Sequence, residues 1–387
     1  MGFLFKDLQL PVIKLPEAAE KVRKEVRAFI KEELQKGTFE PHCDSWLGGF
    51  SPEFSRKLGE RGWLGMTWPR EYGGHGRSAL ERFIVTEELL AAGAPVAAHW
   101  IADRQTGPLL LRFGTESQRK RFLPKISAGE WYFAIGLSEP NTGSDLASVR
   151  TSAKKVENGW IINGSKIWTS GAHRAHYMIA LCRTSLVTDE RHEGMSQLII
   201  DLASPGVTVR PIRLITGEHH FNEVILEEVF VPDEMVIGDI GNGWKQSMTE
   251  LAYERSGPER FLSTFPLLVE LVRVLDKNAN ERARISISEL VAHLWTLRRM
   301  SLGVAGLLEK GIAPDIAASL VKDLGTQFES KIAETARLLY ASVPSLASSS
   351  RFEVLLAQAL LHSPGFTLRG GTTEILRGII ARGLGIR

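Results

Sequence analysis

The chain contains only two cysteines, Cys43 and Cys182, among its 387 residues. Two cysteines are too few for a disulfide scaffold or for a metal site with four cysteine ligands, so a reducing compartment is the simplest expectation. The sequence also lacks an excess of one charge, because 47 basic and 45 acidic residues leave a net charge of +2. No strong overall field therefore favours DNA, RNA or an anionic membrane as a partner.

Long apolar runs are missing as well. The N-terminus has no basic segment followed by a long apolar core, and no stretch reaches the roughly 18 uncharged apolar residues that a membrane-spanning helix needs. Hydrophobic residues make up 43% of the chain and charged residues 24%, which are ordinary proportions for a folded globular protein. We therefore expect a cytoplasmic protein without a membrane anchor, with two to three domains of roughly 150 residues each.

Several catalytic motifs are absent or incomplete. No G-x-G-x-x-G and no G-x-S-x-G occurs, which excludes the nicotinamide-type Rossmann fingerprint and the hydrolase nucleophile elbow. Gly159 and Gly164 have the spacing of a P-loop, but Ser165 and Lys166 follow in the wrong order, in a hairpin-like context. Two histidine pairs lack accompanying cysteines or carboxylates, so structural histidines are a simpler interpretation than metal ligands: His173 with His176, and His219 with His220.

The spacing of apolar residues predicts helices in the first third of the chain. After Pro16, one stripe of a 3.6-residue period runs from Val22 to Leu34, and the helix is expected to end near Gly37. Similar patterns cover residues 51–61, 78–92 and 116–126. We interpret residues 1–130 as an N-terminal helical domain.

Shorter apolar runs and turn dipeptides predict strands in the middle of the chain. Asn158-Gly159 and Asn163-Gly164 favour type I′ hairpins, because both central residues of such a turn need a positive φ. Strand-like segments lie at 160–162, 177–181, 197–202, 207–215 and 223–231. Residues 131–240 are therefore expected to form a compact, barrel-like domain of antiparallel strands.

Long helical patterns return in the last part of the chain, at 244–275, 287–308 and 316–342. Pro258 and Pro266 are expected to kink or split the first of these. We interpret residues 241–387 as a C-terminal four-helix bundle. The predicted fold class is α+β, with a helical domain, a sheet and a second helical domain in that order.

Two segments of the β region carry the chemical information. Residues 135–145 and 164–170 combine glycines with small hydroxyl side chains, which bring N–H and O–H donors close to the edge of a planar ligand, while Trp168 offers a ring for packing. This chemistry suits a flavin. The composition of turns between strands explains the same residues without any ligand, and composition alone does not decide between the two.

These two segments resemble the flavin-binding signatures of the acyl-CoA dehydrogenases. The similarity extends to residues 63–65, 69–74, 230–232, 241–244 and 370–377, so it covers nearly the whole chain. The resemblance implies FAD as cofactor, an acyl-CoA thioester as substrate, no resident metal, and the order of domains already predicted. It also implies roles in flavin binding for Ser138 and Ser144 at the flavin and its phosphates, Trp168 and Ser170 at the ring and its N5 side, and Thr372 and Glu374 near the ribose and phosphates.

The reaction implied by this resemblance removes the α-proton of the substrate while the β-hydrogen leaves as a hydride to flavin N5, giving a trans-2-enoyl-CoA. Many family members carry the catalytic glutamate where this chain has Gly370, which cannot act as a base. A second subgroup, including isovaleryl-type and bacterial two-subunit enzymes, has a Glu-Arg pair early in the C-terminal domain. Glu254 and Arg255 match that pair, as base and substrate-binding residue. The alternative is that they belong to a solvated, charged helix face.

The resemblance is weaker at two family motifs that contact FAD. The regions at 275–286 and 339–344 do not contain Arg-x-x-Phe-Gly or Phe-Gly-Gly-x-Gly. Either a partner chain supplies those contacts in a hetero-oligomer, or a homo-oligomer holds FAD differently. The resemblance further implies a tetramer and an electron-transfer flavoprotein as acceptor. Two other functions stay open: a flavin oxidase or monooxygenase on the same fold, and a non-catalytic partner subunit.

Overall fold

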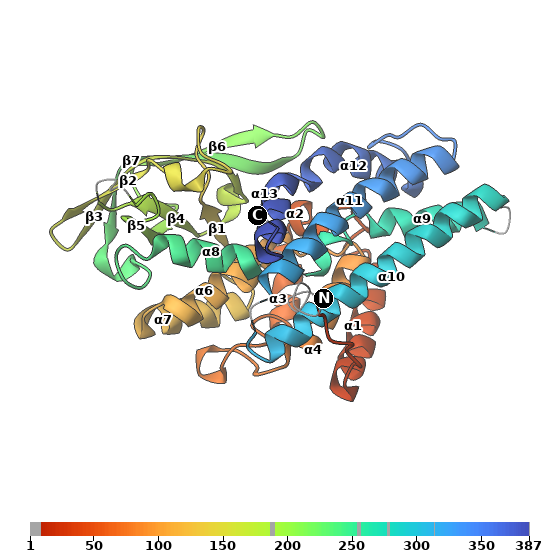
Figure 1. Ribbon diagram of the computed structural model, residues 1–387, viewed down its shortest axis with the longest axis horizontal. Helices are drawn as coiled ribbons and strands as arrows, with labels where there is room; N and C mark the ends of the chain where they lie inside the picture. Colours follow the sequence, from red (N-terminus) through yellow and green to blue (C-terminus); the bar gives the residue numbers. More distant parts are fainter. Residues whose placement is uncertain (1–8, 186–189, 254–256, 277–278, 313, 387) are drawn as a thin grey trace. The chain divides into compact units, whose positions relative to one another are not determined.

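The structure is a computed structural model that describes residues 9–185, 190–253, 257–276, 279–312 and 314–386. The chain forms two compact units (Figure 1). Unit 1 consists of Met1–Phe50, Arg77–Val96 and Arg255–Arg387, and unit 2 of Ser51–Gly76 and Ala97–Glu254. The division into residues 1–130, 131–240 and 241–387 follows the order of the elements along the chain, and it stays a prediction.

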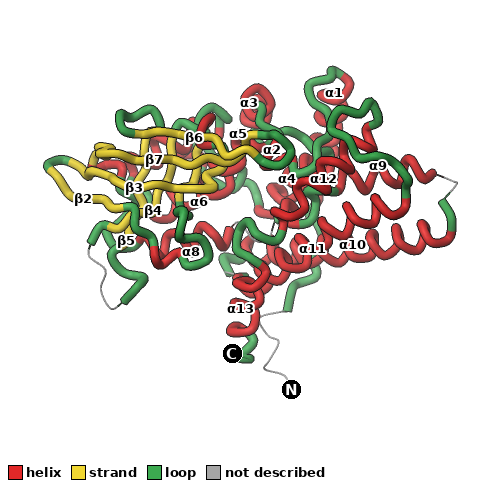
Figure 2. The backbone as a smooth tube through the Cα atoms, turned by 90° about the horizontal axis from the view of Figure 1, so that it is seen from above, coloured by secondary structure: helices red, strands yellow, loops and turns green. Residues whose placement is uncertain are grey.

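Unit 2 is built on one seven-stranded sheet with the order β1-β4-β2-β3-β7-β6, in which β5 also pairs with β4 (Figure 2). The sequence prediction of a central sheet is confirmed. The strands are β1 (Phe133–Gly136), β2 (Ser152–Val156), β3 (Gly159–Ser170), β4 (Tyr177–Arg183), β5 (Met195–Asp201), β6 (Val207–Arg213) and β7 (His219–Pro232).

The pairing differs from the prediction in two respects. Most neighbours are antiparallel, but β1 runs parallel to β4, and Ser152 of β2 also pairs with Arg183 in parallel. The first predicted hairpin is present, but its two loop residues are Glu157 and Asn158, and Gly159 already pairs with Val156. Asn158 has a φ of 58° and Gly159 has no positive φ, so the predicted type I′ turn centred on Asn158 and Gly159 is wrong. The second predicted turn is wrong, because Asn163 and Gly164 lie inside β3, where the register against β7 shifts at a bulge. A hairpin turn and a β-bulge can both contain a glycine with positive φ, so the Asn-Gly dipeptide alone could not distinguish a turn from a bulge.

Helices cover the sheet of unit 2. They are α3 (Pro52–Glu60), α5 (Ala97–Ile101), the π-turn η3 (Ala102–Thr106), α6 (Gly107–Phe113), α7 (Glu116–Ser127) and α8 (Gly243–Tyr253). Helix α7 begins at a capping box, in which the Thr115 hydroxyl and the Gln118 side chain satisfy each other's backbone N–H. Phe122 of α7 packs edge-on against Phe133 of β1 and Tyr177 of β4. This aromatic contact joins the helical layer to the sheet.

Unit 1 contains α1 (Glu17–Gln35), α2 (Ser45–Gly48), α4 (Ala79–Ala91), the 3₁₀ turn η7 (Pro258–Arg260), α9 (Phe265–Leu275), α10 (Glu281–Glu309), α11 (Asp315–Leu339), α12 (Arg351–Phe366) and α13 (Thr373–Gly383). The C-terminal bundle is confirmed, since α11 packs against α9, α10 and α12. The expected interruption near Pro258 and Pro266 is also confirmed, because the pattern at 244–275 is divided among α8, η7 and α9. Among the described residues, no helix has both the length and the apolar character needed to cross a membrane.

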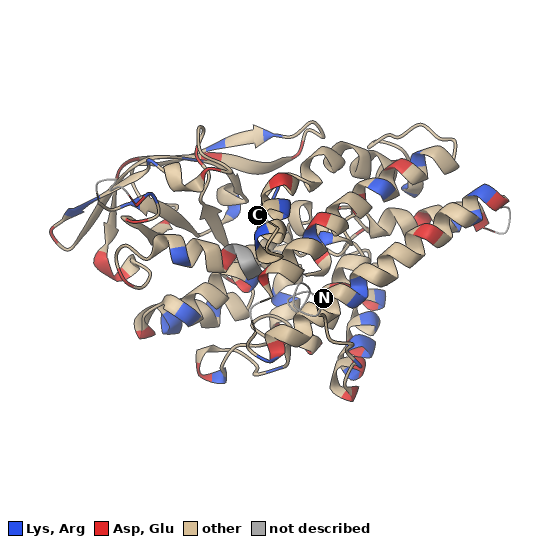
Figure 3. Ribbon diagram, in the orientation of Figure 1, with Lys and Arg blue, Asp and Glu red and all other residues tan. Residues whose placement is uncertain are grey.

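Helices α1, α4 and α10 pack together within unit 1. Apolar contacts join Ala19 of α1, Phe83 of α4 and Leu302 of α10. Acidic and basic side chains are intermixed along α1 (Figure 3). An ion-pair network ties the three helices, with Arg298 of α10 bound to Glu87 by two hydrogen bonds of 2.5 and 2.9 Å.

Candidate functional site

The loop after β1 brings part of the predicted site into contact with β3. Ser138 is half-buried, and its carbonyl accepts a hydrogen bond of 2.9 Å from the N–H of Ile167. Glu139 and Thr142 exchange backbone hydrogen bonds of 2.8 and 2.9 Å, which close a tight turn. Ser144 lies exposed after this turn. The loop is therefore fixed at its base, while its hydroxyl-bearing tip is accessible.

The end of β3 carries a bulge that places Trp168 on the surface. The register against β7 shifts between Lys166 and Thr169, and Trp168 has a φ of 59°. A bulky residue in this left-handed region costs on the order of 1–3 kcal/mol and persists only where the surrounding structure imposes it. Its indole is 56% exposed and contacts Phe221 edge-on, with 6.0 Å between ring centroids. A strained and exposed aromatic ring marks a surface suited to a planar ligand.

Four of the predicted cofactor residues therefore belong to unit 2. The Ser138 carbonyl is bonded to the N–H of Ile167, the residue directly before Trp168. Ser170, at the end of β3, is half-buried and pairs with Phe221 of β7. Ser144 belongs to the same loop as Ser138. A Cβ atom placed on Gly143 would meet no atom within 4 Å, so the surface of this loop is open. These hydroxyl groups, the open loop and the exposed indole fit the edge and face of a flavin.

The other two predicted cofactor residues lie in unit 1, at the start of α13. Thr372 caps this helix, and its hydroxyl accepts a hydrogen bond of 3.5 Å from the N–H of Ile375. Glu374 occupies the first turn, and its pKa lies below the ordinary value because its carboxylate accepts hydrogen bonds from its own backbone N–H and from Thr372. A helix N-terminus attracts anionic groups such as the phosphates of a dinucleotide, and here the Thr372 hydroxyl and the Glu374 carboxylate already accept two of its N–H groups.

The predicted base and its neighbour, Glu254 and Arg255, lie outside the described residues. Helix α8 ends at Tyr253, directly before them. Glu250, one turn earlier, is buried, and its carboxylate accepts a hydrogen bond of 3.0 Å from Gln197 of β5. Glu259 lies in the 3₁₀ turn η7, which begins at Pro258.

The segment before α13 is held by one buried and one largely buried cation. Gly370 and Gly371 have φ values of 67° and 97°, a conformation that favours glycine. Fully buried Lys322 of α11 donates a hydrogen bond of 2.7 Å to the Gly371 carbonyl. Arg369 donates a bond of 2.6 Å to the Asp44 carboxylate. The backbone at position 370 thus favours glycine, and a glutamate in this conformation would be strained.

Asp44 lies at the centre of a buried polar cluster in unit 1 that the sequence analysis missed. Its side chain is 1% exposed and also accepts a bond of 3.2 Å from His362 of α12. Burial alone would raise the pKa of Asp44, but Arg369 and His362 outweigh burial and hold it well below its ordinary value. The guanidinium of Arg369 lies over the Trp46 ring, 4.3 Å from its centroid. No local motif signals this cluster, because Asp44 is separated from His362 and Arg369 by more than 300 residues of sequence.

Glu329 of α11 adjoins this cluster and is expected to make the stability of the protein depend on pH. It is fully buried and accepts a bond of 2.7 Å from the Ser263 N–H, and burial raises its pKa from 4.5 to about 7 against the opposing effect of Arg369. The folded state therefore holds a proton that the unfolded state releases between these values. We expect the free energy of unfolding to fall by on the order of 3 kcal/mol as pH rises from 4.5 to about 7.

Denaturant unfolding at several pH values measures this slope. A Glu329→Gln chain should lose most of the decline, since its side chain does not titrate. An equal decline in both chains would mean that Glu329 is not its source.

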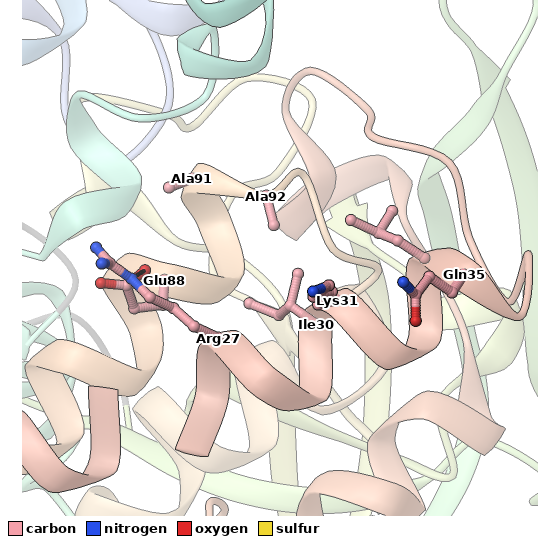
Figure 4. A pocket seen from close by; sticks show the side chains of 8 residues that line it. Arg27, Ile30, Lys31, Gln35, Glu88, Ala91 and Ala92 are labelled. Atoms are coloured by element: carbon pink, nitrogen blue, oxygen red, sulfur yellow. Dashed lines mark hydrogen bonds and ion pairs between the residues drawn. The ribbon is translucent and has the colours of Figure 1, made fainter. Parts of the chain in front are cut away.

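Two further features of the described residues are a stacked pair of histidines and a surface groove. His173 and His219 stack with 3.7 Å between ring centroids, and burial lowers the pKa of His173 to about 4. An open groove between α1 and α4 is lined by residues such as Arg27, Ile30 and Glu88 (Figure 4). None of the predicted site residues lines that groove.

Comparisons with known proteins give consistent results. A model described as the acyl-CoA dehydrogenase N-terminal domain matches residues 16–130, and a model of the middle domain matches residues 134–229. Acyl-CoA dehydrogenase IpdE1 of Mycobacterium tuberculosis is 32% identical, over 94% of this chain and 96% of the relative. A solved structure described as a Tcur3481-Tcur3483 steroid ACAD has a TM-score of 0.87 and 29% identity, over 97% of this chain and 99% of that chain. The ChsE4-ChsE5 complex from Mycobacterium tuberculosis has a TM-score of 0.82 and 27% identity, over the same shares.

Proposed function

We propose that this chain, which belongs to the acyl-CoA dehydrogenase family, uses FAD to convert an acyl-CoA thioester to its trans-2-enoyl-CoA, with Glu254 as the base. The observation that carries the proposal is the bulge of β3, which exposes Trp168 in a left-handed conformation beside the loop of Ser138. Backbone strain of this kind clusters at ligand-binding sites, so the strained and exposed indole favours a planar ligand at this place.

The residues of this site are suited to hold FAD. Trp168 would pack on the ring, and the hydroxyl groups of Ser138, Ser144 and Ser170 would offer donors to its polar edge. We propose that Thr372 and Glu374, at the start of α13, lie near the ribose and phosphates. When bound, FAD supplies the acceptor for the hydride that leaves the β-carbon.

The chain itself must supply the base and hold the thioester. We propose that the Glu254 carboxylate takes the α-proton and that Arg255 lies beside the substrate. A carboxylate is an effective base near neutral pH only if desolvation raises its pKa, so Glu254 must be shielded from water when the substrate is bound. Hydrogen bonds to the thioester carbonyl would stabilise the negative charge that develops as the proton leaves.

Anaerobic titration of the FAD-loaded protein with a panel of acyl-CoA esters tests this function. Because one structural neighbour is described as a steroid ACAD, ring-bearing acyl-CoA thioesters belong in the panel beside linear ones. We expect at least one of them to bleach the visible absorbance of the flavin. Slow reoxidation in air would support a dehydrogenase, and rapid reoxidation an oxidase. Unchanged absorbance with every thioester would contradict the proposal.

We also propose that the chain works in an oligomer, with an electron-transfer flavoprotein as acceptor. Helix α10 exposes Ile285, Val291 and Trp295, whose side chains are 55%, 51% and 62% accessible. Large apolar side chains gathered on one helix are typical of a protein interface. The similarity to the ChsE4-ChsE5 complex favours a second, different polypeptide as partner. Co-purification of such a polypeptide would support the hetero-oligomer, and full FAD occupancy in a chain expressed alone would argue against it.

A further inference from the structure

A buried ion pair lies directly behind the flavin-facing surface proposed above. Lys166 of β3 is fully buried, and Glu139 of the loop after β1 is 7% exposed, with 2.8 Å between the Lys166 Nζ and the Glu139 Oε1. Neither residue belongs to the proposed cofactor contacts. A buried charge is costly unless it is paired and fully hydrogen-bonded, so such a pair calls for a physical explanation.

Both charged groups have a full set of partners. The Lys166 ammonium also donates to the carbonyls of Leu181 on β4, at 2.6 Å, and of Leu137, at 3.4 Å. The Glu139 carboxylate accepts bonds of 2.8 and 2.9 Å from the backbone N–H groups of Arg150 and Thr151. Burial alone would raise the pKa of Glu139, but Lys166 and these N–H groups hold it below the ordinary value. The ion pair therefore connects β3 and β4 with both ends of the loop between β1 and β2.

The position of the pair in the chain connects it to the proposed site. Glu139 directly follows Ser138, and Lys166 precedes Trp168 by two residues, at the residue where the bulge of β3 begins. The other end of the bulge is held by fully buried Asn222, whose side-chain amide donates a bond of 2.9 Å to the Thr169 carbonyl. The strained conformation of Trp168 is thus fixed from both sides by buried polar side chains.

Strand β1 leaves room for the Lys166 side chain. A Cβ atom placed on Gly136 of β1 would lie 3.0 Å from Lys166 Cγ and 2.7 Å from the sulfur of Met178. Glycine at this position therefore permits the lysine stem to pass under the loop. An apolar side chain at 166 could fill the same space, but it could not bind Glu139 and the two carbonyls at once.

We infer that Lys166 and Glu139 are a pair of positioning residues, which hold the loop of Ser138 against the bulge of Trp168 so that the two parts are preorganised for a planar cofactor. The inference rests on the proposed function for the identity of that cofactor as FAD. Preorganised sites bind more tightly because the ligand does not have to order them. Loss of the pair should therefore weaken FAD binding beyond any loss of stability.

Titration of the apoprotein with FAD tests this inference. For Lys166→Met and Glu139→Gln we expect the dissociation constant of FAD to rise by at least about tenfold, with a changed visible circular dichroism of the bound flavin. Two controls separate positioning from stability. Val231→Ala removes buried apolar contact elsewhere in the sheet, and Lys155→Met breaks the exposed pair with Asp233, whose atoms lie 2.6 Å apart. Both controls should keep the dissociation constant and the dichroism of the unchanged chain.

The double variant Glu139→Gln/Lys166→Met sharpens the test. Removing both charges avoids an unpaired buried charge, so its melting temperature should recover toward that of the unchanged chain, while FAD binding stays weak. Recovery of both properties would overturn the inference, as would single variants that melt earlier but bind FAD with unchanged affinity and dichroism.

Hydrogen exchange of the apoprotein gives a measurement that does not need FAD. The N–H of Ile167, bound to the Ser138 carbonyl, should exchange faster in both single variants than in Val231→Ala at matched stability. Unchanged protection of that amide would overturn the inference, whatever the cofactor. Failure of the unchanged chain to bind FAD, both alone and together with its co-purified partner polypeptide, would instead contradict the proposed function, and exchange would still decide whether the pair holds the loop.

Discussion

Replacing Glu254 with glutamine is expected to abolish the bleaching of the flavin by acyl-CoA and to lower turnover by about 10²- to 10⁴-fold. Glutamine has nearly the same shape as glutamate but cannot accept the α-proton near neutral pH. Because Glu254 is proposed to act on the substrate and not on FAD, the variant should contain as much FAD as the unchanged chain. Stopped-flow absorbance with a thioester that bleaches the unchanged chain measures the effect.

Glu250→Gln provides the matched control for this experiment. Glu250 lies one turn earlier on α8, and its carboxylate accepts a hydrogen bond of 3.0 Å from Gln197. An amide oxygen can accept the same bond, so this variant should still be bleached by substrate. Turnover retained by the Glu254→Gln chain, or lost equally in both variants, would refute the assignment of Glu254 as the base.

Removal of the Asp44 carboxylate is expected to cause a large loss of stability. Asp44→Ala leaves the Arg369 guanidinium, 14% exposed, without the carboxylate that it contacts at 2.6 Å. Breaking one partner of a buried ion pair costs about 3–5 kcal/mol. Denaturant unfolding should therefore show a large shift of the midpoint.

Glu334→Ala serves as the control for Asp44. Glu334 of α11 forms an exposed pair with Arg337 three residues along the helix. Such surface pairs contribute little, because water screens both charges. The unfolding midpoint of this variant should stay close to that of the unchanged chain. A similarly small change for Asp44→Ala would mean that solvent reaches Arg369 and compensates for the lost carboxylate.

The regular elements could largely be predicted from the sequence. A helix was expected from Pro16 to near Gly37, and α1 covers Glu17–Gln35. The prediction succeeded because the apolar stripe of this helix is continuous and a proline precedes its first residue. The hairpin at Asn158 was predicted for an equally local reason. The bulge at Gly164 was not, because the same dipeptide occurs in turns and bulges, and only the pairing of β3 with β7 decides between them.

The buried polar groups mark the limit of what the pattern could reveal. No local pattern marks Lys166 as buried, because charged side chains are rarely fully buried. Its burial follows from Glu139, 27 residues earlier, and from the space left by Gly136. The cofactor residues of the loop and of α13 were named by resemblance to a family. Their placement at a fixed loop, a bulge and a helix start is what the structure adds.

The way the chain is divided between the two units has a consequence for its synthesis on the ribosome. Every residue of unit 2 lies between positions 51 and 254, whereas unit 1 needs both ends of the chain. The sheet and its covering helices are thus all available for folding before α9 to α13 have been made. The apolar faces of α1 and α4, by contrast, stay without their α10 partner until translation has passed Leu302. Helices α1 and α4 are therefore made long before the partner that completes their burial.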